Sequence, residues 1–540
     1  NTDHADRPQP TNGGDTAETP QGDSGGGGIY FTIRTKGVQL RYLLESIRVI
    51  LEPSDKEDES ISAFQALMVS TASRVGTGNI AGISTAICFG GPGAIFWMWM
   101  TAILGSATAF VESTLAQIYK RRAEDGSCYG GPSYYIEAVL KKRWLGVLYA
   151  IFMILTYMVG FNLVASFNVA DSFKVYSFYN PSLTPILIGI IQAVIFGICI
   201  SGGGKQIAKI TGILVPVMGG LYIAAALLMI ILHGNMIPGM FASIFEGAFD
   251  IQAIFGGFMG SVVMLGIKRG LFSNEAGVGA SATAAGSAGV SHPVKQGLVQ
   301  VLSVFIDTVV ICSATAFLLL CSGVAPSADM AGMAYVQAAM NNVFGTAGVV
   351  FITVALILFA FTTLLGNYYF AETGMAYLCG KTPVKGIRIT QRVIAIVIVL
   401  IGSVASLGIV WDTADVLMGL MAVINVPIIF LIAKPALRCL EDYRAQKQAG
   451  KNPVFKAADI EKKVILRPLM VVAGDHANND MAGDDDDSWK SQFEASGAFD
   501  SIDTQIAGLG EIQAIQQLYV AHTQAAIDAA FCSILRLWMR

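Results

Sequence analysis

Charged residues are scarce in this chain of 540 residues. Asp, Glu, Lys and Arg make up 14% of it, whereas 54% of the residues are hydrophobic. An average soluble domain is about one quarter charged, and disordered chains and coiled coils carry more charge still. Both of those classes are therefore excluded. The formal net charge is −4, so the basic excess typical of nucleic-acid-binding proteins is also missing.

Motifs for metal or nucleotide chemistry are absent as well. The eight cysteines form no C-x-x-C pair, and most of them lie inside apolar segments. A disulfide framework or a zinc site is therefore not expected. The chain has neither H-E-x-x-H nor G-x-x-x-x-G-K-[ST], which argues against zinc proteolysis and ATP hydrolysis. With no catalytic constellation, the sequence indicates a protein that is not an enzyme and needs no organic cofactor.

Long apolar segments dominate what remains. A helix needs about 20 predominantly apolar residues to cross the roughly 30 Å hydrocarbon core of a bilayer. Ten segments meet this need and lie near 61–89, 92–119, 144–170, 182–201, 207–233, 251–289, 296–322, 345–378, 390–410 and 414–435. The sequence therefore predicts an all-α polytopic membrane protein embedded in a lipid bilayer.

Composition divides the chain into four parts. Residues 1–28 are polar and rich in Gly, Pro, Asp and Thr, which is typical of a disordered tail. Residues 29–60 mix apolar and basic residues and are expected to include an amphipathic helix at the membrane surface, with a soluble helix as the alternative. The ten-helix core is expected at 61–437, followed at 438–540 by a cytoplasmic tail of uncertain structure.

Basic residues in the loops predict the orientation. If the residues before 61 are cytoplasmic, the inner loops are 120–143, 202–209, 290–297 and 380–392. These loops carry 13 Lys and Arg residues, whereas the outer loops carry only Lys174. Because basic residues concentrate on the cytoplasmic side, both ends of the core are expected there.

Two of the ten segments are interrupted by polar, Gly-rich stretches. The first contains SRVGTGN at 73–79, and the sixth contains KRGLFSNEAGVG at 268–279. Irregular backbone at membrane depth is tolerated only where it is buried in protein or lines a cavity. Each interruption falls in the first segment of a set of five, which is the pattern of an inverted-repeat transporter with its site at the midplane. The alternative is two unrelated glycine kinks that ease helix packing.

The first interruption suggests how charged groups are bound. Glycine lets the chain leave helical geometry at little steric cost. A second half-helix expected to begin near Ile80 would then offer free N–H groups to an anion, such as the carboxylate of an amino acid. The half-helix before it, expected to end near Ala72, would offer carbonyl oxygens to Na⁺.

The sixth segment adds polar candidates. Phe272 and Asn274 are placed to cover and to bind a substrate, although a ring such as Phe272 is as often a packed core residue. Arg269 and Glu275 are ionisable groups near membrane depth, where a functional role is the default. The simpler interpretation is that these two side chains neutralise each other.

Three further spans also carry polar side chains. In the eighth, Thr362 and Thr363 have hydroxyls that would complete a Na⁺ site, or that bond instead to carbonyls of their own helix. Glu112 and Asp307 lie in the second and seventh spans. Bonds between helices, or solvated cavities, are the expected role of these two carboxylates rather than an ion path.

Several blocks resemble the alanine or glycine:cation symporter family, also called sodium:alanine symporters. The resemblance covers roughly residues 29–456. Its blocks are FQAL at 64–67, SRVGTGNIAG at 73–82, GGPGAIFWMWMTAILG at 90–105, AFVESTLAQIYK at 109–120, YGGPSYYIE at 129–137, RGLFSNEAGVG at 269–279, HPVKQGLV at 292–299, FIDT at 305–308 and FAFTTLLGNYYFAE at 359–372.

The resemblance implies a fold and a function. The fold would be a LeuT-like 5+5 inverted repeat with its first and sixth core helices broken. The function would be secondary active import of a small neutral amino acid, alanine or glycine, with Na⁺ or, in some members, H⁺, by alternating access. A passive channel or uniporter of the same fold is the alternative. The location implied is a bacterial inner membrane.

The resemblance also implies site residues. The amides around Thr77 and Gly78 would hold the substrate carboxylate. The implied substrate site comprises Gly76, Thr77, Gly78, Asn79, Phe272, Ser273, Asn274 and Asn367. The implied Na⁺ site comprises the carbonyls of Ala72 and Val75 with the hydroxyls of Thr362 and Thr363.

Overall fold

The computed structural model of the chain describes residues 24–52, 61–122, 128–250, 262–380, 383–456, 463–466, 468, 472–496 and 501–538. These residues form two compact units. The core unit contains the residues up to Val290 together with Lys295–Ile432. The C-terminal unit contains Ser291–Val294 together with the residues from Ala433 onward.

The first half of the core unit consists almost entirely of helices. Its elements are α1 (Ser24–Arg34), α2 (Val38–Arg41), α3 (Leu43–Ile50), α4 (Ala63–Arg74), η1 (Gly78–Gly82), α5 (Ile83–Gly90), α6 (Ala94–Ile118), β1 (Arg121–Arg122), β2 (Cys128–Tyr129), α7 (Pro132–Leu140), α8 (Arg143–Ile154), η2 (Leu155–Phe161), α9 (Asn162–Asp171), η3 (Ser172–Val175), α10 (Thr184–Ile200), α11 (Gly203–Leu232), η4 (Gly234–Met236) and α12 (Ile237–Phe249). Strands β1 and β2 pair antiparallel, with Arg121 opposite Tyr129. A capping box starts α4, because the side chains of Ser62 and Gln65 each accept the other's backbone N–H.

The second half repeats this order of elements. It contains α14 (Val262–Asn274), α15 (Ala280–Gly286), α16 (Pro293–Val304), η5 (Phe305–Cys312), α17 (Ser313–Leu320), η6 (Ala328–Met330), α18 (Met333–Cys379), α19 (Lys385–Val404) and α20 (Leu407–Ile432). Each half has a broken helix, a long span, a short helix and three further spans. In the second half the short helix is the part of α18 before Gly345, where a φ of 61° kinks the chain. This order agrees with a five-plus-five repeat.

Among the described residues, seven helical stretches are long and apolar enough to cross a membrane. They are Ala94–Ile118, Arg143–Val175, Gln206–Leu232, Pro293–Leu320, Met333–Cys379, Lys385–Val404 and Leu407–Ile432. Helix α10 is apolar but has 17 residues, and the remaining two spans are the broken helices α4–η1–α5 and α14–α15. The prediction of an all-α polytopic membrane protein is confirmed.

Some boundaries differ from the sequence-based expectation. Residues 24–28, expected within the disordered tail, form the first turns of α1, and the rest of that tail lies outside the described residues. Helices α7 and α12 were not expected as separate elements. Helix α20 begins at Leu407 rather than 414, and the C-terminal unit begins at Ala433 rather than 438. Part of the sixth span, 251–261, lies outside the described residues.

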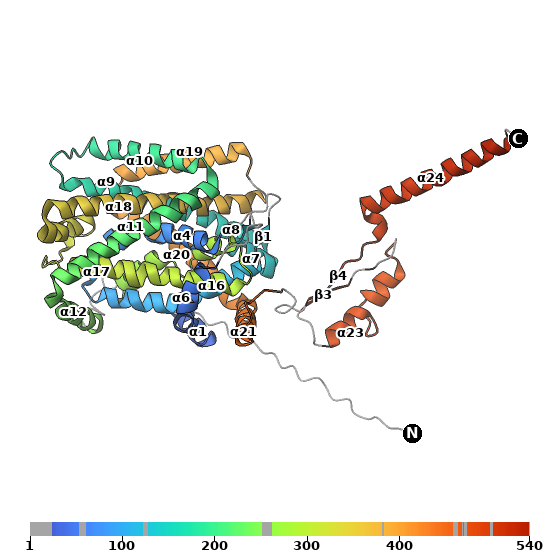
Figure 1. Cartoon of the computed structure of the whole chain (residues 1–540), viewed down its shortest axis with the longest axis horizontal. Helices are drawn as coiled ribbons and strands as arrows, with labels where there is room; N and C mark the ends of the chain where they lie inside the picture. Colours follow the sequence, from blue (N-terminus) through green and yellow to red (C-terminus); the bar gives the residue numbers. More distant parts are fainter. Residues whose placement is uncertain are drawn as a thin grey trace, which may run out of the picture. The chain divides into compact units, whose positions relative to one another are not determined.

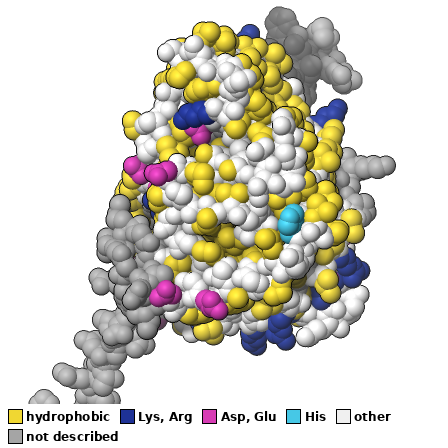
Figure 2. Space-filling model, turned by 90° about the vertical axis from the view of Figure 1, so that its left-hand side faces the viewer, with side chains coloured by type: hydrophobic (Ala, Val, Ile, Leu, Met, Phe, Trp, Pro, Cys, Tyr) yellow, Lys and Arg dark blue, Asp and Glu magenta, His cyan; other side chains and the backbone are white. Residues whose placement is uncertain are grey.

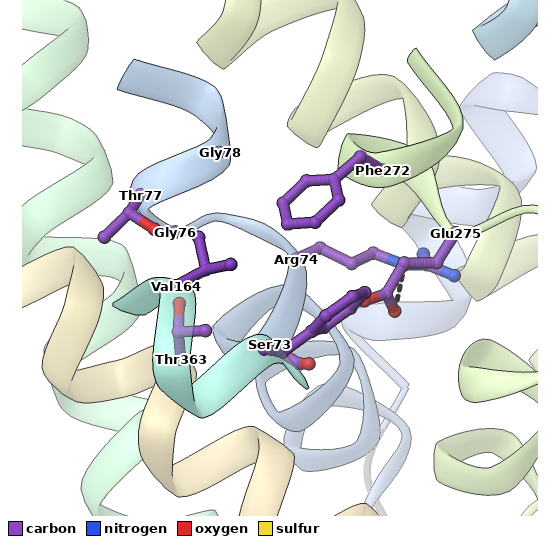
Figure 3. Close-up of a pocket in the computed structure, with 10 residues that line it drawn as sticks. Ser73, Arg74, Gly76, Thr77, Gly78, Val164, Phe272, Glu275 and Thr363 are labelled. Carbon is purple, nitrogen blue, oxygen red and sulfur yellow. Dashed lines mark ion pairs between the residues drawn. The ribbon is translucent and has the colours of Figure 1, made fainter. Parts of the chain in front are cut away.

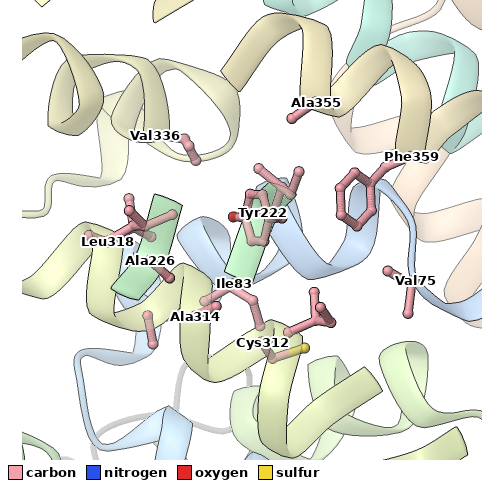
Figure 4. Packing of buried hydrophobic residues seen from close by; sticks show 14 of the residues in the cluster. Val75, Ile83, Tyr222, Ala226, Cys312, Ala314, Leu318, Val336, Ala355 and Phe359 are labelled. Atoms are coloured by element: carbon pink, nitrogen blue, oxygen red, sulfur yellow. The ribbon is translucent and has the colours of Figure 1, made fainter. Parts of the chain in front are cut away.

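Figure 1 shows the helices of the core unit running side by side, with α10 next to α19 and α9 next to α18. Helix α6 packs along both halves of the second broken helix, α14 and α15, while α11 and α18 pack against α4. A cluster of buried hydrophobic residues fills the space between these last helices and α17, with the Tyr222 and Phe359 rings 5.2 Å apart (Figure 4). This packing fixes the position of the first broken helix.

Hydrophobic side chains also cover the outside of the spans. Ile198, Ile231 and Val423 are 65%, 76% and 72% exposed, and they lie on α10, α11 and α20. Hydrocarbon is the solvent that accommodates such a surface without cost. Figure 2 views the end of the core unit that lies at the left of Figure 1, where hydrophobic and uncharged side chains cover most of the visible face. Ile33 of α1, Leu44 of α3 and Leu51 just after α3 are exposed as well.

The C-terminal unit has a different composition of elements. It contains α21 (Lys434–Gln448), β3 (Lys463–Leu466), η7 (His476–Met481), α23 (Trp489–Ala495), β4 (Ser501–Thr504), η8 (Leu509–Glu511) and α24 (Gln513–Trp538). Strands β3 and β4 pair in parallel, with Lys463 opposite Ser501. Near its start, His292 Nε2 lies 3.0 Å from Asp442 Oδ2, and the imidazole packs edge-on against Tyr443.

Candidate functional site

The first broken helix separates where the sequence predicted, within 73–79. Helix α4 ends at Arg74 rather than near Ala72, and the second half-helix starts at Gly78 rather than near Ile80. The Asn79 side chain accepts a hydrogen bond of 2.9 Å from the Gly76 N–H, so the break satisfies one of its own backbone donors. The unwound segment therefore contains only Val75 and Gly76, and both are buried.

The close approach of α18 depends on glycine at position 76. A side chain there would collide with the Thr363 hydroxyl. At Gly366, one turn further along α18, a Cβ atom would lie 2.7 Å from the Ser73 backbone nitrogen. These two glycines allow α18 to pack directly on the first break.

The second break is shorter than predicted. Helix α14 continues to Asn274, so the expected unwinding from Lys268 is wrong, and only residues 275–279 are non-helical. Glu275, Gly277 and Gly279 have φ values of 51°, 83° and 101°. This left-handed region is readily available to glycine and unusual for a glutamate, so the backbone at Glu275 is strained.

Side chains from three other helices hold the second break. Asn425 Nδ2 donates to the Gly277 carbonyl at 2.9 Å, and the Tyr149 hydroxyl donates to the Val278 carbonyl at 2.6 Å. The Glu112 carboxylate accepts from Ser281 Oγ at 2.5 Å and from Asn425 Nδ2 at 3.1 Å. Glu112 therefore makes the interhelical bonds expected of it. Asn425 and Tyr149 satisfy carbonyls that unwinding leaves free.

A small cavity lies between the two breaks (Figure 3). Its volume is about 10 Å³, which is room for about one water molecule. It is lined by the first broken helix, by η2 and α9, by the end of α14 with its break, and by α18. The lining residues are Ser73, Arg74, Gly76, Thr77, Gly78, Phe161, Val164, Phe272, Glu275 and Thr363.

Five of the residues predicted for the site line this cavity: Gly76, Thr77, Gly78, Phe272 and Thr363. Seven others lie outside its lining: Ala72, Val75, Asn79, Ser273, Asn274, Thr362 and Asn367. The sequence reasoning missed Ser73, Arg74, Phe161 and Val164 as wall residues. Phe161 and Val164 carry no signal beyond hydrophobicity, but Arg74 is a charged residue inside an apolar span.

Phe272 forms one wall of the cavity and belongs to an aromatic cluster. Its ring centre lies 4.9 Å from the Phe161 ring and 4.9 Å from the Trp411 ring. The ring also lies directly against Gly78, where a Cβ atom would be 2.8 Å from Phe272 Cε1. Phe272 is therefore both a packed ring and a wall of the cavity, so its two interpretations are compatible.

Behind the cavity, Asp307 joins the two broken helices. Its carboxylate accepts from Asn79 Nδ2 at 2.6 Å, from Ser273 Oγ at 2.5 Å and from Thr308 Oγ1 at 2.8 Å. The Asn79 carbonyl in turn accepts from the Thr315 hydroxyl at 2.6 Å. Asn79 and Ser273 thus connect the breaks to η5 and α17, and Asp307 makes the interhelical bonds expected of it.

Asn274 and Asn367 have structural partners. Asn274 Oδ1 accepts from the Ala276 N–H at 3.0 Å and closes the turn after α14. Asn367 accepts from Ser73 Oγ at 2.7 Å and donates to Asn162 Oδ1 at 3.0 Å. These bonds connect α18 with α4 and α9.

The two threonines of α18 point in different directions. Both bond to carbonyls of their own helix, each reaching Phe359 O at 2.9 Å. Thr362 also contacts Met218 Sδ of α11 at 3.5 Å, whereas Thr363 lies on the cavity wall beside Gly76. Adjacent helical residues differ by about 100° in direction, which explains the divergence.

The expected pairing of Arg269 with Glu275 is not found. Arg269 Nη2 lies 3.5 Å from Asp415 Oδ2, and its guanidinium lies over the Trp411 ring at 4.2 Å. Glu275 instead faces Arg74, with 3.8 Å between Glu275 Oε2 and Arg74 Nε. Sequence proximity suggested the wrong partner, because each of these side chains pairs with a residue of another helix, Arg269 with α20 and Glu275 with α4.

Comparison with known proteins decides the family. The profile of the sodium:alanine symporter family matches residues 26–457, most of the chain. The chain belongs to this family. It is 45% identical over 429 residues to the probable sodium/glutamine symporter GlnT of Bacillus subtilis, a match that covers 79% of this chain and 88% of that protein.

Two other family members give similar values. The amino-acid carrier protein AlsT of Bacillus subtilis is 42% identical, with 80% of this chain and 91% of AlsT covered. The sodium/alanine symporter AgcS of Methanococcus maripaludis is 38% identical, with 74% and 88% covered. The resemblance inferred from the sequence blocks is thus confirmed: this symporter is a polytopic membrane protein with bacterial and archaeal relatives.

The solved structures that match this chain are more distant. A manganese transporter of Eremococcus coleocola has a TM-score of 0.44 at 14% identity, covering 72% of this chain and 81% of that one. A Na⁺-coupled sialic acid symporter has a TM-score of 0.43 at 11% identity, covering 76% and 87%.

A second profile, that of cobalt chelatase (CbiK), matches residues 395–528. This match covers about a quarter of the chain and includes α20, a membrane span, so it does not establish a second family. Among the described residues, no group of three or more His, Cys, Asp or Glu side chains is arranged to hold a metal ion.

Proposed function

We propose that this symporter imports alanine, glycine or a similarly small neutral amino acid together with Na⁺, by alternating access. The observation that carries this proposal is the cavity between the two broken helices. At about 10 Å³ the cavity must widen to admit any amino acid. Its walls of Phe161, Val164 and Phe272 bring apolar side chains close to the backbone of the first break, which favours a substrate with a small side chain. The relatives support amino-acid transport with Na⁺, since one is named for alanine and another for glutamine.

Each part of the site has a role in this proposal. The amides around Thr77 and Gly78 bind the substrate carboxylate at the start of the second half-helix, where the helix dipole favours an anion. Na⁺ binds where α4 ends, to the carbonyls of Ala72 and Val75. Thr363 is the better placed of the two threonines to complete that site, because it lies beside Gly76.

We further propose a bacterial inner-membrane location with both ends of the core unit in the cytoplasm. The Lys and Arg residues of the loops support this orientation. One relative is named as a sodium/proton-dependent alanine carrier, so H⁺ is the alternative coupling ion.

Uptake into proteoliposomes tests the function. With an inward Na⁺ gradient, labelled alanine should accumulate above its external concentration, and the accumulation should collapse when the gradient is dissipated. A uniporter of the same fold would only equilibrate alanine across the membrane. Equal uptake with Na⁺ and with choline, at the same membrane potential and pH, would contradict Na⁺ coupling.

We predict that Thr363→Val weakens Na⁺ binding. The substitution keeps the shape of the side chain and removes its oxygen. A lost hydrogen-bond-type contact to a charged group costs about 1.5–3 kcal/mol, which corresponds to a roughly ten- to hundredfold higher Na⁺ concentration for half-maximal uptake. Alanine affinity at saturating Na⁺ should change little.

Thr373→Val is a matched control on the same helix. Thr373 is also buried and bonds to the Tyr369 carbonyl of its own helix at 3.1 Å, but it lies away from the cavity. Thr315 is unsuitable, because its hydroxyl donates to the Asn79 carbonyl. If Thr363→Val and Thr373→Val give the same Na⁺ dependence, the Thr363 hydroxyl serves only its own helix.

We predict that Phe272→Leu broadens substrate selectivity. The smaller side chain enlarges the cavity, so uptake of larger neutral amino acids such as glutamine should rise relative to alanine. The Na⁺ dependence should stay as it is. Phe359→Leu is the control, since Phe359 is buried against Tyr222 and does not line the cavity. An equal change in selectivity for both variants would assign Phe272 to packing alone.

A further inference from the structure

We infer that Arg74 and Glu275 together recognise the two charges of a zwitterionic α-amino acid. The Arg74 guanidinium takes part in binding the carboxylate, and the Glu275 carboxylate binds the ammonium group. This inference rests on the proposed function and deepens it. The amides of the first break provide only for the carboxylate, so they leave the ammonium group without a ligand.

The position of the pair is the first argument. Arg74 is the last residue of α4, and Glu275 is the first residue after α14, so one charge lies at each break. Both side chains line the cavity, and they are 0% and 1% exposed. Figure 3 shows the Arg74 side chain running beneath Phe272 toward Glu275. A substrate between the breaks therefore meets both charges.

The second argument is that the pair keeps its hydrogen-bonding capacity free. Arg74 Nε and Glu275 Oε2 are 3.8 Å apart, beyond the distance of a hydrogen bond. None of the three Arg74 nitrogens, and neither Glu275 oxygen, makes a hydrogen bond of good geometry to a described residue, although the Tyr157 hydroxyl lies close enough to Glu275 to interact with it. Buried charges in this state are costly, and a guest that hydrogen-bonds to both removes the cost.

The other buried carboxylates near the breaks are different. Glu112 accepts hydrogen bonds from Ser281 and Asn425, and Asp307 accepts them from Asn79, Ser273 and Thr308. Neither of these carboxylates lines the cavity. Glu275 thus combines a position on the cavity wall with unused acceptor oxygens, which is what a ligand for an ammonium group requires.

The chemistry of the pair selects a class of substrate. A monocarboxylate would pair with Arg74 in competition with Glu275 and would leave the Glu275 carboxylate without a cation. An amine would pair with Glu275 and leave Arg74 without an anion. A zwitterion brings one charge of each sign and leaves the net charge of the cavity unchanged. Apolar contacts with Phe161, Val164 and Phe272 then restrict the side chain, so the pair selects the backbone of the amino acid while the rings select its size.

Three ligands separate the two charges. L-Alanine carries both, propionate carries only the carboxylate, and alaninamide carries only the ammonium group. For each ligand we would measure the concentration that gives half-maximal thermal stabilisation of the purified full-length protein in saturating Na⁺. This readout depends on binding and not on transport.

The expected pattern crosses over between two variants. Glu275→Gln should weaken alanine and alaninamide by about tenfold or more without weakening propionate. Arg74→Gln should weaken alanine and propionate by about as much without weakening alaninamide. Glu112→Gln is the matched control for loss of a buried carboxylate, and it should affect the three ligands alike. An equal effect of Glu275→Gln on all three would overturn the inference.

The double variant Arg74→Gln/Glu275→Gln covers the case in which single variants fail to fold, because it buries no unpaired charge. Because the amides of the first break remain, the double variant should bind alanine and propionate with similar affinities. A persistent preference for alanine over propionate would contradict the inference. The failure of the proposed function would look different. If the variants show the crossed binding pattern but the wild-type protein shows no Na⁺-dependent uptake, symport is disproved and the charge recognition still holds.

Discussion

Gly78→Ala should reduce Na⁺-dependent alanine uptake to background. The added methyl group would lie 2.8 Å from Phe272 Cε1 and 2.9 Å from Cδ1, closer than real side chains approach. The ring cannot retreat freely, since Phe161 and Trp411 pack on it with centres 4.9 Å away. Overpacking of this kind typically costs about 1–3 kcal/mol, and here the displacement falls on the wall of the substrate cavity.

Gly219→Ala is the matched control. Gly219 lies within α11, and a Cβ atom there meets nothing within 4 Å. This variant should transport as the wild-type protein does. Surface labelling should show equal amounts of both variants in the membrane. In gel filtration, both purified variants should elute as the wild-type protein does. Phe272→Leu in the Gly78→Ala background should restore part of the uptake, whereas unaltered alanine affinity in Gly78→Ala alone would show that position 78 lies outside the site.

The positions of the two breaks were predictable, because a polar, Gly-rich stretch within an apolar span is stable only where protein buries it. The residues at which each break begins and ends were harder to predict. Residues 268–274 remain helical because Lys268 and Arg269 find a partner in Asp415, with 2.8 Å and 3.5 Å to its Oδ2. Unwinding is therefore not needed to accommodate these charges. The break itself contains Glu275, Gly277 and Gly279, which all have left-handed backbone conformations. The sequence does not predict a glutamate in this conformation.

Pairing of polar groups was the least accessible information. Arg269 and Glu275 are near in sequence, yet each pairs with a residue of another helix, Asp415 and Arg74. Asn79 was predicted to bind substrate, but it lies outside the cavity lining and bonds to Asp307, which lies 228 residues away. Hydrogen bonds and ion pairs between residues far apart in the sequence depend on how the spans pack, and a single sequence does not record that packing directly.

The direction of neighbouring side chains raised a related difficulty. Thr362 and Thr363 are equivalent in composition, and only packing against α11 distinguishes them. Because Met218 takes the Thr362 hydroxyl, Thr363 alone lines the cavity. The size of the site also comes from Phe161 and Val164, whose apolar side chains are indistinguishable in the sequence from ordinary membrane-facing residues.

Single substitutions at Asn79 or Asp307 should strongly reduce uptake, and exchanging the two side chains in a double variant should restore part of it. Asn79→Asp sets a second carboxylate against Asp307, where Nδ2 and Oδ1 are now 2.6 Å apart. Asp307→Asn removes an acceptor that Asn79, Ser273 and Thr308 use. Each hydrogen bond to a charged group is worth about 1.5–3 kcal/mol, so each single variant should lose roughly tenfold or more in uptake and melt at a lower temperature.

The double variant Asn79→Asp/Asp307→Asn re-forms one amide–carboxylate pair with the donor and acceptor exchanged. The carboxylate introduced at position 79 would still accept from the Gly76 N–H, as the Asn79 side chain does now at 2.9 Å. The double variant should therefore recover both melting temperature and uptake relative to the single variants, although Ser273 and Thr308 must then share a neutral acceptor. If the two losses simply add, the pair does not couple the broken helices. Recovery of stability without uptake would show instead that transport requires the charge specifically at position 307, within η5.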